Sequence, residues 1–243
     1  PYTVSDERQT GREIKADFKG TLYPQQADAS AKILEHDTGV LCAATAFGKT
    51  AVGAYLIAQR KVNTLVLVHN SEIMKNWVED FEKFLQINED LPEYITPKGR
   101  RKKRKSVIGT LSGGRNTLGG ILDVAMITSL GQGDDVNPLI KNYGMVIMDE
   151  CHHAGAAIAE DVLNDVSAKY VYGLTATPKR DDGQEQKIFM QLGPIRYRYT
   201  AKDRAAAQNV QHFVYPRFTR LFAPNANKLS YNQARRVVVD STI

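Results

Sequence analysis

Two short stretches of the sequence combine residues that could bind and cleave a phosphate chain. Residues 43–50, AATAFGKT, match the phosphate-binding pattern G-x-x-x-x-G-K-[ST], except that Ala43 replaces its first glycine. In such a loop Lys49 would reach the β- and γ-phosphates, and the Thr50 hydroxyl would hold Mg²⁺. Residues 148–153, MDECHH, end an apolar run in two adjacent carboxylates. The stretches predict a nucleoside triphosphate site; a glycine-containing turn and an exposed acidic turn are the alternatives.

The paired carboxylates have complementary uses in phosphoryl transfer. An apolar strand that delivers two carboxylates to one place is unfavourable unless a cation meets them. Asp149 could hold Mg²⁺, and Glu150 could be the base that orients the attacking water. Cys151, His152 and His153 could suggest zinc, but consecutive residues seldom converge on one ion, and the sequence has no C-x-x-C partner. We therefore expect magnesium.

The hydrophobic pattern supplies the elements that would bring these stretches together. Short runs rich in valine and isoleucine alternate with helical patterns, as in a parallel sheet buried on both faces. The predicted strands are 39–43, 64–69, 106–111, 123–130, 144–150 and 169–177, and the predicted helices include 50–60 and 71–85. The pattern predicts an α/β fold: a doubly wound, mostly parallel sheet flanked by helices. Ligands bind such folds beyond the carboxyl ends of the strands.

The helix predicted over 71–85 carries apolar residues at three-to-four spacing. We predict that Ser71 is its N-cap. Trp77 lies on the apolar stripe, so we expect it to belong to the core rather than to contact a ligand.

The composition indicates a globular domain and argues against a membrane protein. The 243 residues are 42% hydrophobic and 24% charged, which suits one large α/β domain or two small ones. No apolar stretch approaches the roughly 18 residues that span a bilayer, and the N-terminal stretch does not resemble a secretion signal. Two cysteines give no disulfide framework. We expect no membrane partner and a cytoplasmic location.

The net charge of +5 is unevenly distributed. Residues 98–105, KGRRKKRK, contain seven basic side chains. Such a run could be a solvated loop, or it could contact nucleic-acid phosphates and release their counterions. The run alone does not decide between these interpretations.

Taken together, the motifs resemble the first RecA-like lobe of superfamily 2 helicases and translocases over roughly residues 12–200. Six stretches follow the order of that family: LYPQQ (22–26), ATAFGKT (44–50), LVLVHN (65–70), ITSL (127–130), DECH (149–152) and TATP (175–178). Many members lack the first glycine of the phosphate loop, so the resemblance permits Ala43. The stretch TATPKRDDG (175–183) resembles the helicase subunits of type I and type III restriction enzymes and the excision-repair helicases. The DECH box is shared with double-stranded RNA sensors and processing helicases.

The resemblance implies a P-loop NTPase and a role for each matching residue. Gln26 would read adenine, which implies ATP. The catalytic residues would be Glu150, Lys49 and Asp149, and Mg²⁺ would be held by Thr50 and Asp149. The nucleotide would be bound by the loop residues Thr45, Ala46, Phe47, Gly48, Lys49 and Thr50. The ATP state would be coupled to nucleic acid by His152, Thr175 and Thr177. Nucleic acid would contact His69, Asn70, Thr128 and Ser129, joined by Arg101, Lys102, Lys103 and Arg104 of the basic run.

The predicted organisation places an N-terminal lead-in at 1–20, the ATP-binding domain at 21–200, and an edge strand with a linker at 201–243. The stretch PIRYRYT (194–200) alternates like an edge strand. No motifs of the family's second RecA-like lobe follow, so that lobe would be a partner, and this lobe alone would bind ATP and turn it over weakly. The arginine finger of the second lobe would raise the rate of ATP hydrolysis about 10³–10⁵-fold.

The expected function is the ATP-binding lobe of a DNA helicase or translocase. An RNA helicase or double-stranded RNA translocase of the DECH type is the alternative. A vestigial nucleotide-binding module is disfavoured because Lys49, Asp149 and Glu150 are all present. A small-molecule P-loop kinase is disfavoured because residues 106–170 show neither an arginine-bearing lid nor an acceptor pocket.

Overall fold

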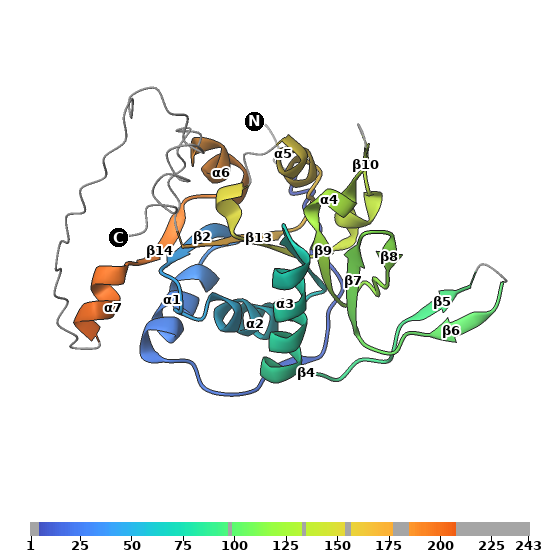
Figure 1. Ribbon diagram of the computed structural model, residues 1–243, viewed down its shortest axis with the longest axis horizontal. Coiled ribbons are helices and arrows are strands. Elements are labelled where there is room, and N and C mark those ends of the chain that lie inside the picture. Colours follow the sequence, from blue (N-terminus) through green and yellow to red (C-terminus); the bar gives the residue numbers. More distant parts are fainter. Residues whose placement is uncertain (1–4, 97–98, 133–134, 154–156, 177–184, 208–243) are drawn as a thin grey trace, which may run out of the picture. The chain divides into compact units, whose positions relative to one another are not determined.

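An eight-stranded sheet forms the centre of the computed structural model, which describes residues 5–96, 99–132, 135–153, 157–176 and 185–207. The strands lie in the order β14-β2-β13-β12-β3-β9-β7-β8 (Figure 1). Their bounds are β2 (Thr38–Ala43), β3 (Thr64–Val68), β7 (Ile108–Ser112), β8 (Arg115–Asn116), β9 (Leu122–Met126), β12 (Met145–Asp149), β13 (Tyr170–Thr175) and β14 (Ile195–Tyr199). Within this sheet every neighbouring pair is parallel except β7 with β8. The predicted mostly parallel sheet is confirmed.

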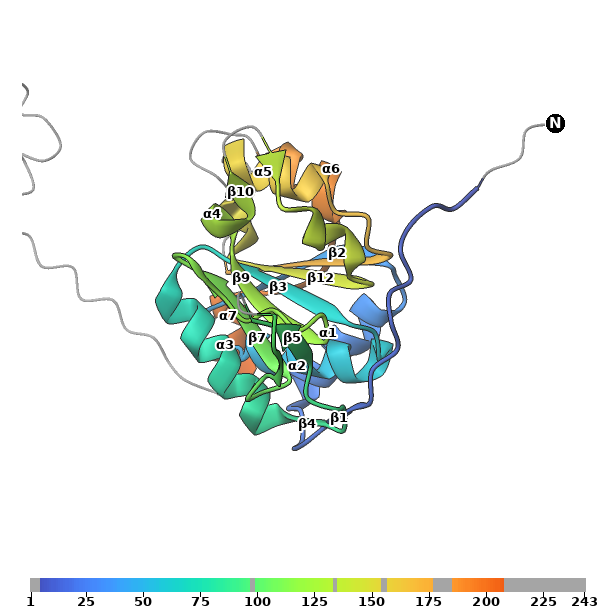
Figure 2. The same cartoon turned by 90° about the vertical axis from the view of Figure 1, so that its right-hand side faces the viewer.

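Helices cover both faces of the sheet, which explains why its strands are apolar throughout. One face carries α1 (Pro24–Leu34), α2 (Lys49–Arg60) and α3 (Ser71–Phe84); the other carries α4 (Ile127–Leu130), α5 (Ala157–Asn164) and α6 (Glu185–Leu192) (Figures 1 and 2). Along β3, Val66 and Val68 enter the core beneath α1–α3, whereas Leu65 and Leu67 enter the core beneath α4–α6. Alternate side chains of one strand therefore stabilise two separate cores.

Smaller elements decorate this framework. Three two-stranded antiparallel sheets pair β1 (Ala16–Phe18) with β4 (Leu85–Ile87), β5 (Glu93–Ile95) with β6 (Arg101–Lys103), and β10 (Gly131–Gln132) with β11 (Asp135–Val136). Two 3₁₀ helices, η1 (Pro138–Asn142) and η2 (Cys151–His153), precede and follow β12. The predicted edge strand at 194–200 is confirmed as β14, which pairs with β2.

Two predicted element boundaries are wrong. The strand expected over 123–130 ends at Met126, because 127–130 form the single helical turn α4. The N-cap of α3 is Asn70 rather than Ser71, since the Asn70 Oδ1 accepts a hydrogen bond from the Ile73 N–H at 2.8 Å. Of the region 201–243, predicted to hold an edge strand and a linker, the structure describes only 201–207, which form the helix α7 (Ala201–Ala207). Residues 208–243 lie outside the described part.

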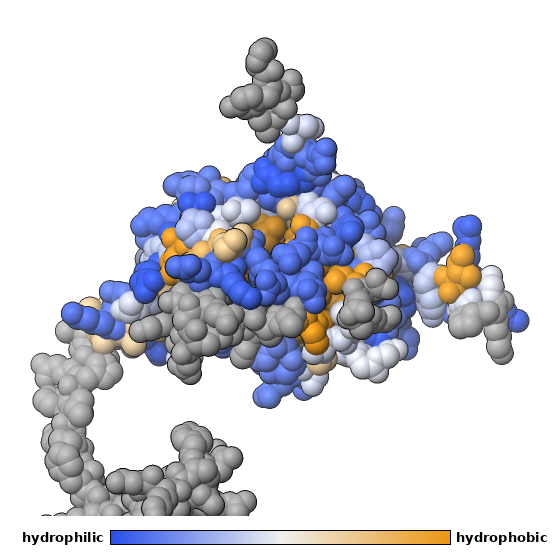
Figure 3. All heavy atoms as spheres, turned by 90° about the horizontal axis from the view of Figure 1, so that it is seen from above, coloured by the Kyte–Doolittle hydropathy of each residue, from blue (hydrophilic) through white to orange (hydrophobic). Residues whose placement is uncertain are grey.

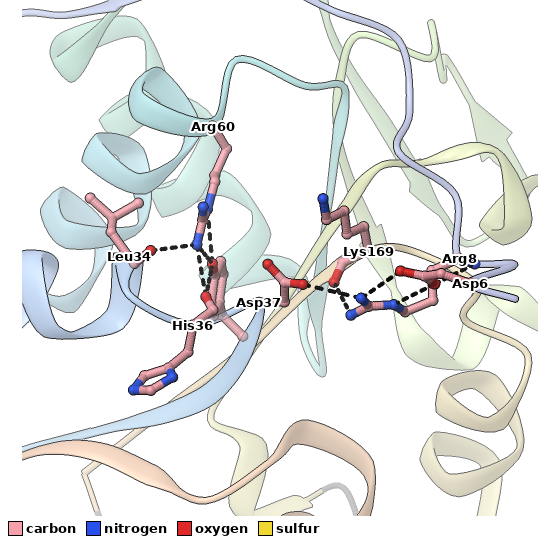
Figure 4. A network of polar contacts seen from close by, with 8 residues as sticks. Asp6, Arg8, Leu34, His36, Asp37, Arg60 and Lys169 are labelled. Carbon is pink, nitrogen blue, oxygen red and sulfur yellow. Dashed lines mark hydrogen bonds and ion pairs between the residues drawn. The ribbon is translucent and has the colours of Figure 1, made fainter. Parts of the chain in front are cut away.

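The segment predicted as a lead-in belongs to the domain. Ile14 and Ala16 are buried in the core beneath α1–α3. Nearer the N-terminus, the Arg8 guanidinium lies 2.8 Å from the Asp6 carboxylate and 3.2 Å from Asp37, and it donates to the Lys169 carbonyl at 3.4 Å (Figure 4). Asp37 and Lys169 immediately precede β2 and β13. The segment around Arg8 is thus fixed at the amino ends of β2 and β13.

A second polar network fixes the end of α2. The Arg60 guanidinium donates to the carbonyls of Leu34 and His36 at 2.9 and 2.7 Å and to the Tyr172 hydroxyl (Figure 4). Burial raises the pKa of Tyr172 to about 12, although the bond from Arg60 opposes that shift. Because a guanidinium donates in several fixed directions, this one residue ties α2 to the end of α1 and to β13.

The face of the molecule seen from above in Figure 3 is mostly hydrophilic, with small apolar areas. This is expected where α4–α6 turn their apolar side chains toward the sheet. In the described part of the chain, none of the helices combines the length and hydrophobicity that crossing a membrane requires.

Candidate nucleotide site and nucleic-acid face

Most of the candidate site residues lie in one row, along the carboxyl ends of five neighbouring strands. In the order of the sheet, β2 leads into the phosphate loop, β13 ends in Thr175, β12 ends in Asp149, β3 leads to His69 and Asn70, and β9 leads into α4 with Thr128 and Ser129. Ala43, which ends β2, and Thr175, which ends β13, are more than 130 positions apart in the sequence, yet the parallel topology places them on one edge. Candidate nucleotide residues occupy one half of the row and candidate nucleic-acid residues the other.

The phosphate loop has a backbone suited to surrounding an anion. It leaves β2 at Ala43 and enters α2 at Lys49, with Gly48 in the left-handed region at φ 84°. Ala46 also has a positive φ, 62°, which is uncommon for a residue with a side chain. Left-handed residues in such a turn direct successive N–H groups inward, and the helix that follows presents its positive end.

Gln26 braces this loop from behind. Its side-chain Nε2 donates to the Phe47 carbonyl at 2.7 Å, and its Oε1 accepts from the Tyr23 N–H at 2.9 Å. Only 5% of the Gln26 surface is exposed. A Cβ on Gly48 would lie 2.4 Å from the Gln26 amide nitrogen. Gln26 therefore positions the loop directly, and its reading of adenine stays a prediction.

Glu150 lies at the centre of a set of polar contacts. The Lys49 Nζ lies 3.7 Å from one Glu150 carboxylate oxygen, and the His152 Nδ1 lies 3.3 Å from the other. The same His152 nitrogen is 3.1 Å from the Thr175 hydroxyl. Glu150 itself has a positive φ, 47°, and strained backbone of this kind is common at functional sites. The structure thus brings Lys49, Glu150, His152 and Thr175 together; Thr177 lies outside the described residues.

Asp149 is held by two donors. Its Oδ2 accepts from the Trp77 indole Nε1–H at 2.8 Å, and its Oδ1 accepts from the Glu150 N–H at 2.9 Å. Burial raises the pKa of Asp149 above its ordinary value, and both hydrogen bonds oppose that shift. A nearby cation would favour the ionised carboxylate in the same way. The prediction that Trp77 is a core residue is confirmed, since 1% of it is exposed, but its contact with Asp149 was missed.

Thr50 also has a partner on α3. Burial raises the pKa of the Asp80 carboxylate, and an interaction with the Thr50 hydroxyl opposes that shift. Thr50 is in the first turn of α2 and Asp80 is in the third turn of α3. Nothing in the sequence pattern relates these two positions.

Cys151 is a core residue of the DECH segment. Its thiol is buried, and burial raises its pKa well above the ordinary value. A Cβ on Gly173 would lie 2.9 Å from the Cys151 sulfur, so a glycine at that position of β13 makes room for it.

Among the described residues no group of three or more His, Cys, Asp or Glu side chains could hold a metal ion. Magnesium at phosphate sites takes only one or two protein carboxylates.

The candidate nucleic-acid residues are accessible to different degrees. Thr128 is exposed, whereas His69, Asn70 and Ser129 are half-buried. The Ser129 hydroxyl accepts from the Gly113 N–H at 3.3 Å. The Asn70 side chain caps α3, so its oxygen already serves the helix start.

A groove beside Thr128 and Ser129 was not predicted from the sequence. It has a volume of about 390 Å³, and its lining includes Gly113 and Gly114. These glycines, at φ 49° and 87°, form the two-residue turn between β7 and β8. Two adjacent glycines between strands are a known hairpin signal, so the turn could have been found from the sequence.

The basic run forms a hairpin strand rather than a loop. Arg101, Lys102 and Lys103 make up β6 and are exposed. The Arg104 guanidinium lies 4.2 Å from the centre of the Tyr94 ring, half-buried, and reaches the Asn116 carbonyl at 3.4 Å. The hairpin extends away from the β7–β8 end of the sheet (Figure 1). A groove of about 500 Å³ lies between them, and its mixed lining includes the basic residues Lys102, Arg104 and Arg115 as well as Glu82 and Tyr94.

The fold and this row of side chains define the chain as the first RecA-like lobe of a superfamily 2 helicase. The sequence profile of the family described as "Type III restriction enzyme, res subunit" matches residues 19–180. That match covers more than half of the chain, and the chain belongs to this family. The resemblance inferred from the six motifs is confirmed.

Curated relatives carry helicase and translocase names. "DNA 3'-5' helicase XPB" of Kineococcus radiotolerans is 30% identical over 222 residues, which cover 88% of this chain and 36% of the relative. "DNA 3'-5' translocase XPB2" of Sulfurisphaera tokodaii is 25% identical over 219 residues, covering 90% and 44%. "Putative ATP-dependent RNA helicase L396" of Acanthamoeba polyphaga mimivirus is 29% identical over 182 residues, covering 73% and 32%. The chain spans less than half the length of each.

Solved structures share the fold. T4 UvsW superposes with a TM-score of 0.56 at 15% identity, over 78% of this chain and 39% of that one. The Sulfolobus solfataricus SWI2/SNF2 ATPase core, solved in complex with double-stranded DNA, has a TM-score of 0.52 at 16% identity, over 76% and 38%. Likeness at this level of identity supports the α/β, RecA-like assignment and nothing finer.

Proposed function

We propose that this lobe binds Mg²⁺-ATP and, with a second RecA-like lobe, drives movement along DNA. The observation that carries the proposal is the single row on the sheet edge: the phosphate loop, both carboxylates, and then the residues that follow β3 and β9. ATP chemistry and a nucleic-acid track would share one rigid edge. The names of the curated relatives support DNA as the track.

Each side chain of the nucleotide half has a distinct part in hydrolysis. Lys49 would bind the terminal phosphates, because it lies where the loop enters α2. Glu150 would orient the attacking water and take its proton, with His152 holding its second oxygen. Asp149 and Thr50 fit a magnesium site, since a buried carboxylate and a hydroxyl are hard oxygen ligands. When bound, the ion would neutralise charge that develops on the phosphate oxygens.

The choice of DNA over RNA rests on the relatives. One of the three relatives is named an RNA helicase, and RNA is therefore the second candidate. The contacts proposed at His69, Asn70, Thr128 and Ser129 would go mainly to phosphates, which position a strand without specifying its sequence. A location in the cytoplasm agrees with two cysteines, Cys42 and Cys151, that are both buried and free.

Nucleic-acid-stimulated ATP hydrolysis tests the function. In the polypeptide that carries both RecA-like lobes, we expect DNA to raise the rate of ATP hydrolysis, and single-stranded DNA, duplex DNA and RNA are compared at equal nucleotide concentration. Because the second lobe would supply the arginine finger, the lobe described here should bind ATP and hydrolyse it slowly. Stimulation by RNA alone would favour the second candidate. Hydrolysis that responds to no nucleic acid would refute both.

The β5–β6 hairpin is proposed as an additional contact to the nucleic-acid backbone. Replacing Arg101, Lys102 and Lys103 with alanine should weaken DNA binding and flatten its dependence on salt. Each lost phosphate contact lowers the slope of log affinity against log salt by about 0.7–0.9. The three side chains are exposed, so folding should be unaffected. Fluorescence anisotropy of labelled DNA at several salt concentrations measures the slope.

A control variant removes the same charge elsewhere. Lys15, Lys32 and Lys141 are exposed and lie outside the hairpin and the carboxyl edge. Their replacement by alanine should leave the salt slope near the wild-type value. Equal slopes for the hairpin variant, the control and the wild type would mean that the basic run is a solvated surface.

A further inference from the structure

Helix α3 contacts both side chains proposed to hold Mg²⁺. Trp77 donates a hydrogen bond to Asp149 at 2.8 Å. Asp80, one turn further along, is buried enough to raise its pKa, and its interaction with the Thr50 hydroxyl opposes that shift. We propose that Trp77 and Asp80 are positioning residues that orient the two magnesium ligands from outside the coordination sphere. The inference rests on the proposed Mg²⁺-ATP site and adds the element that organises it.

The contact between Trp77 and Asp149 has little freedom. The indole is 1% exposed, and its ring packs 5.2 Å from the Phe81 ring, measured between centroids. On its other side a Cβ on Gly53 would lie 2.7 Å from the ring, so the glycine in α2 gives the indole its space. An indole N–H is a donor only. A ring locked in this position therefore directs one N–H at Oδ2 and fixes the rotation of the carboxylate.

The contact between Asp80 and Thr50 orients a hydroxyl. An ionised carboxylate only accepts hydrogen bonds, so in this interaction the Thr50 hydroxyl would be the donor. The lone pairs of the hydroxyl oxygen are then directed elsewhere and remain available to a cation. Carboxylates that hydrogen-bond a metal ligand also raise its basicity. Neither Trp77 nor Asp80 is thereby a ligand; each sets the direction of one.

The two contacts share one rigid support. Residues 77 and 80 lie on one face of α3 because three-residue spacing is close to a helical turn. The same helix begins at the Asn70 cap, beside His69, where the proposed nucleic-acid face lies. A displacement of α3 by a bound strand would move both magnesium ligands together. This gives the two halves of the row a physical connection.

The test compares magnesium dependence in three variants of the full-length polypeptide. Binding of ADP with a fluorescent N-methylanthraniloyl group is followed by anisotropy, first in EDTA and then during titration with Mg²⁺. We expect Trp77→Phe and Asp80→Ala each to raise the Mg²⁺ concentration at half-effect about 10-fold, as for other partners of metal ligands. Affinity in EDTA should stay within about twofold, because Lys49 and the loop are untouched. The control is Val78→Ala, which shortens a half-buried apolar side chain on the same helix.

The outcomes separate this inference from the proposed function. A Mg²⁺ midpoint shifted in Trp77→Phe and Asp80→Ala but not in Val78→Ala supports positioning. Equal midpoints in all four proteins, or an equal shift in Val78→Ala, would overturn it. Asp80 is partly exposed, so Asp80→Ala decides the matter if Trp77→Phe fails to fold. A wild-type protein that binds the labelled ADP without any response to Mg²⁺ would refute the proposed function instead.

Discussion

Replacing Glu150 with glutamine should leave ATP bound and lower its rate of hydrolysis by about 10²–10⁴-fold, the usual contribution of a general base. Glutamine has nearly the same shape and can still contact Lys49 and His152, which lie 3.7 and 3.3 Å from the two carboxylate oxygens. It cannot accept the proton of the attacking water. Single-turnover hydrolysis of radiolabelled ATP measures the rate, and equilibrium binding of ATP measures the affinity.

A matched control uses the same substitution on the helix surface. Glu79 in α3 is exposed and lies 3.6 Å from Lys75 as an ordinary helical ion pair. Such pairs contribute little to stability, so Glu79→Gln should hydrolyse ATP at the wild-type rate. Hydrolysis by Glu150→Gln at more than a tenth of the wild-type rate would show that another group takes the proton. His152 would then be the first residue to examine, because it lies next to Glu150.

Replacing Gly48 with alanine should weaken ATP binding by about 10–100-fold. The left-handed backbone at φ 84° costs a residue with a Cβ about 1–2 kcal/mol. The new Cβ would also lie 2.4 Å from the Gln26 amide nitrogen, and displacing Gln26 breaks its bond to Phe47, worth about 0.5–1.5 kcal/mol. Every 1.4 kcal/mol is tenfold in affinity. Calorimetric titration with ATP measures the change.

Two further variants divide that effect into its causes. Gln26→Ala alone loses the bond to Phe47 but keeps glycine at position 48, so it should lose only part of the affinity. Gly99 has a similar φ, 73°, and a Cβ there would meet no atom within 4 Å. Gly99→Ala therefore introduces strain outside the loop and should bind ATP normally. Wild-type affinity in Gly48→Ala would mean that the loop adopts another backbone when it binds phosphate.

Much of the architecture could be predicted from the sequence, because a parallel sheet that is buried on both faces requires strands that are continuous apolar runs. Each apolar run became a strand, and the residue at its end reached the predicted edge. The errors arose where two local conformations suit the sequence almost equally well. Asn70 and Ser71 are both good N-caps, and only the backbone decides that Asn70 takes the position. The stretch 127–130 is apolar enough for a strand, yet it turns into α4 beyond β9.

The contacts that organise the site were beyond sequence reasoning for a different reason. The spacing of apolar residues in α3 predicts that Trp77 is a core residue. That spacing does not indicate that the indole N–H donates to Asp149, 72 residues away. Gln26 reads as a nucleotide contact, but its amide is bonded to the loop carbonyl of Phe47. Such contacts depend on how α1 and α3 pack beside α2. A sequence pattern shows which face of each helix is apolar. It does not show how two helices are rotated relative to each other.

The contact of Trp77 with Asp149 has an optical consequence. This sequence contains a single tryptophan, so its ultraviolet-excited indole emission originates at one known point. The excited indole is sensitive to the field around its ring, and here the nearest charge-bearing group is the carboxylate that accepts its N–H. Intrinsic emission of this lobe is therefore a label-free gauge of whatever alters the charge on that carboxylate.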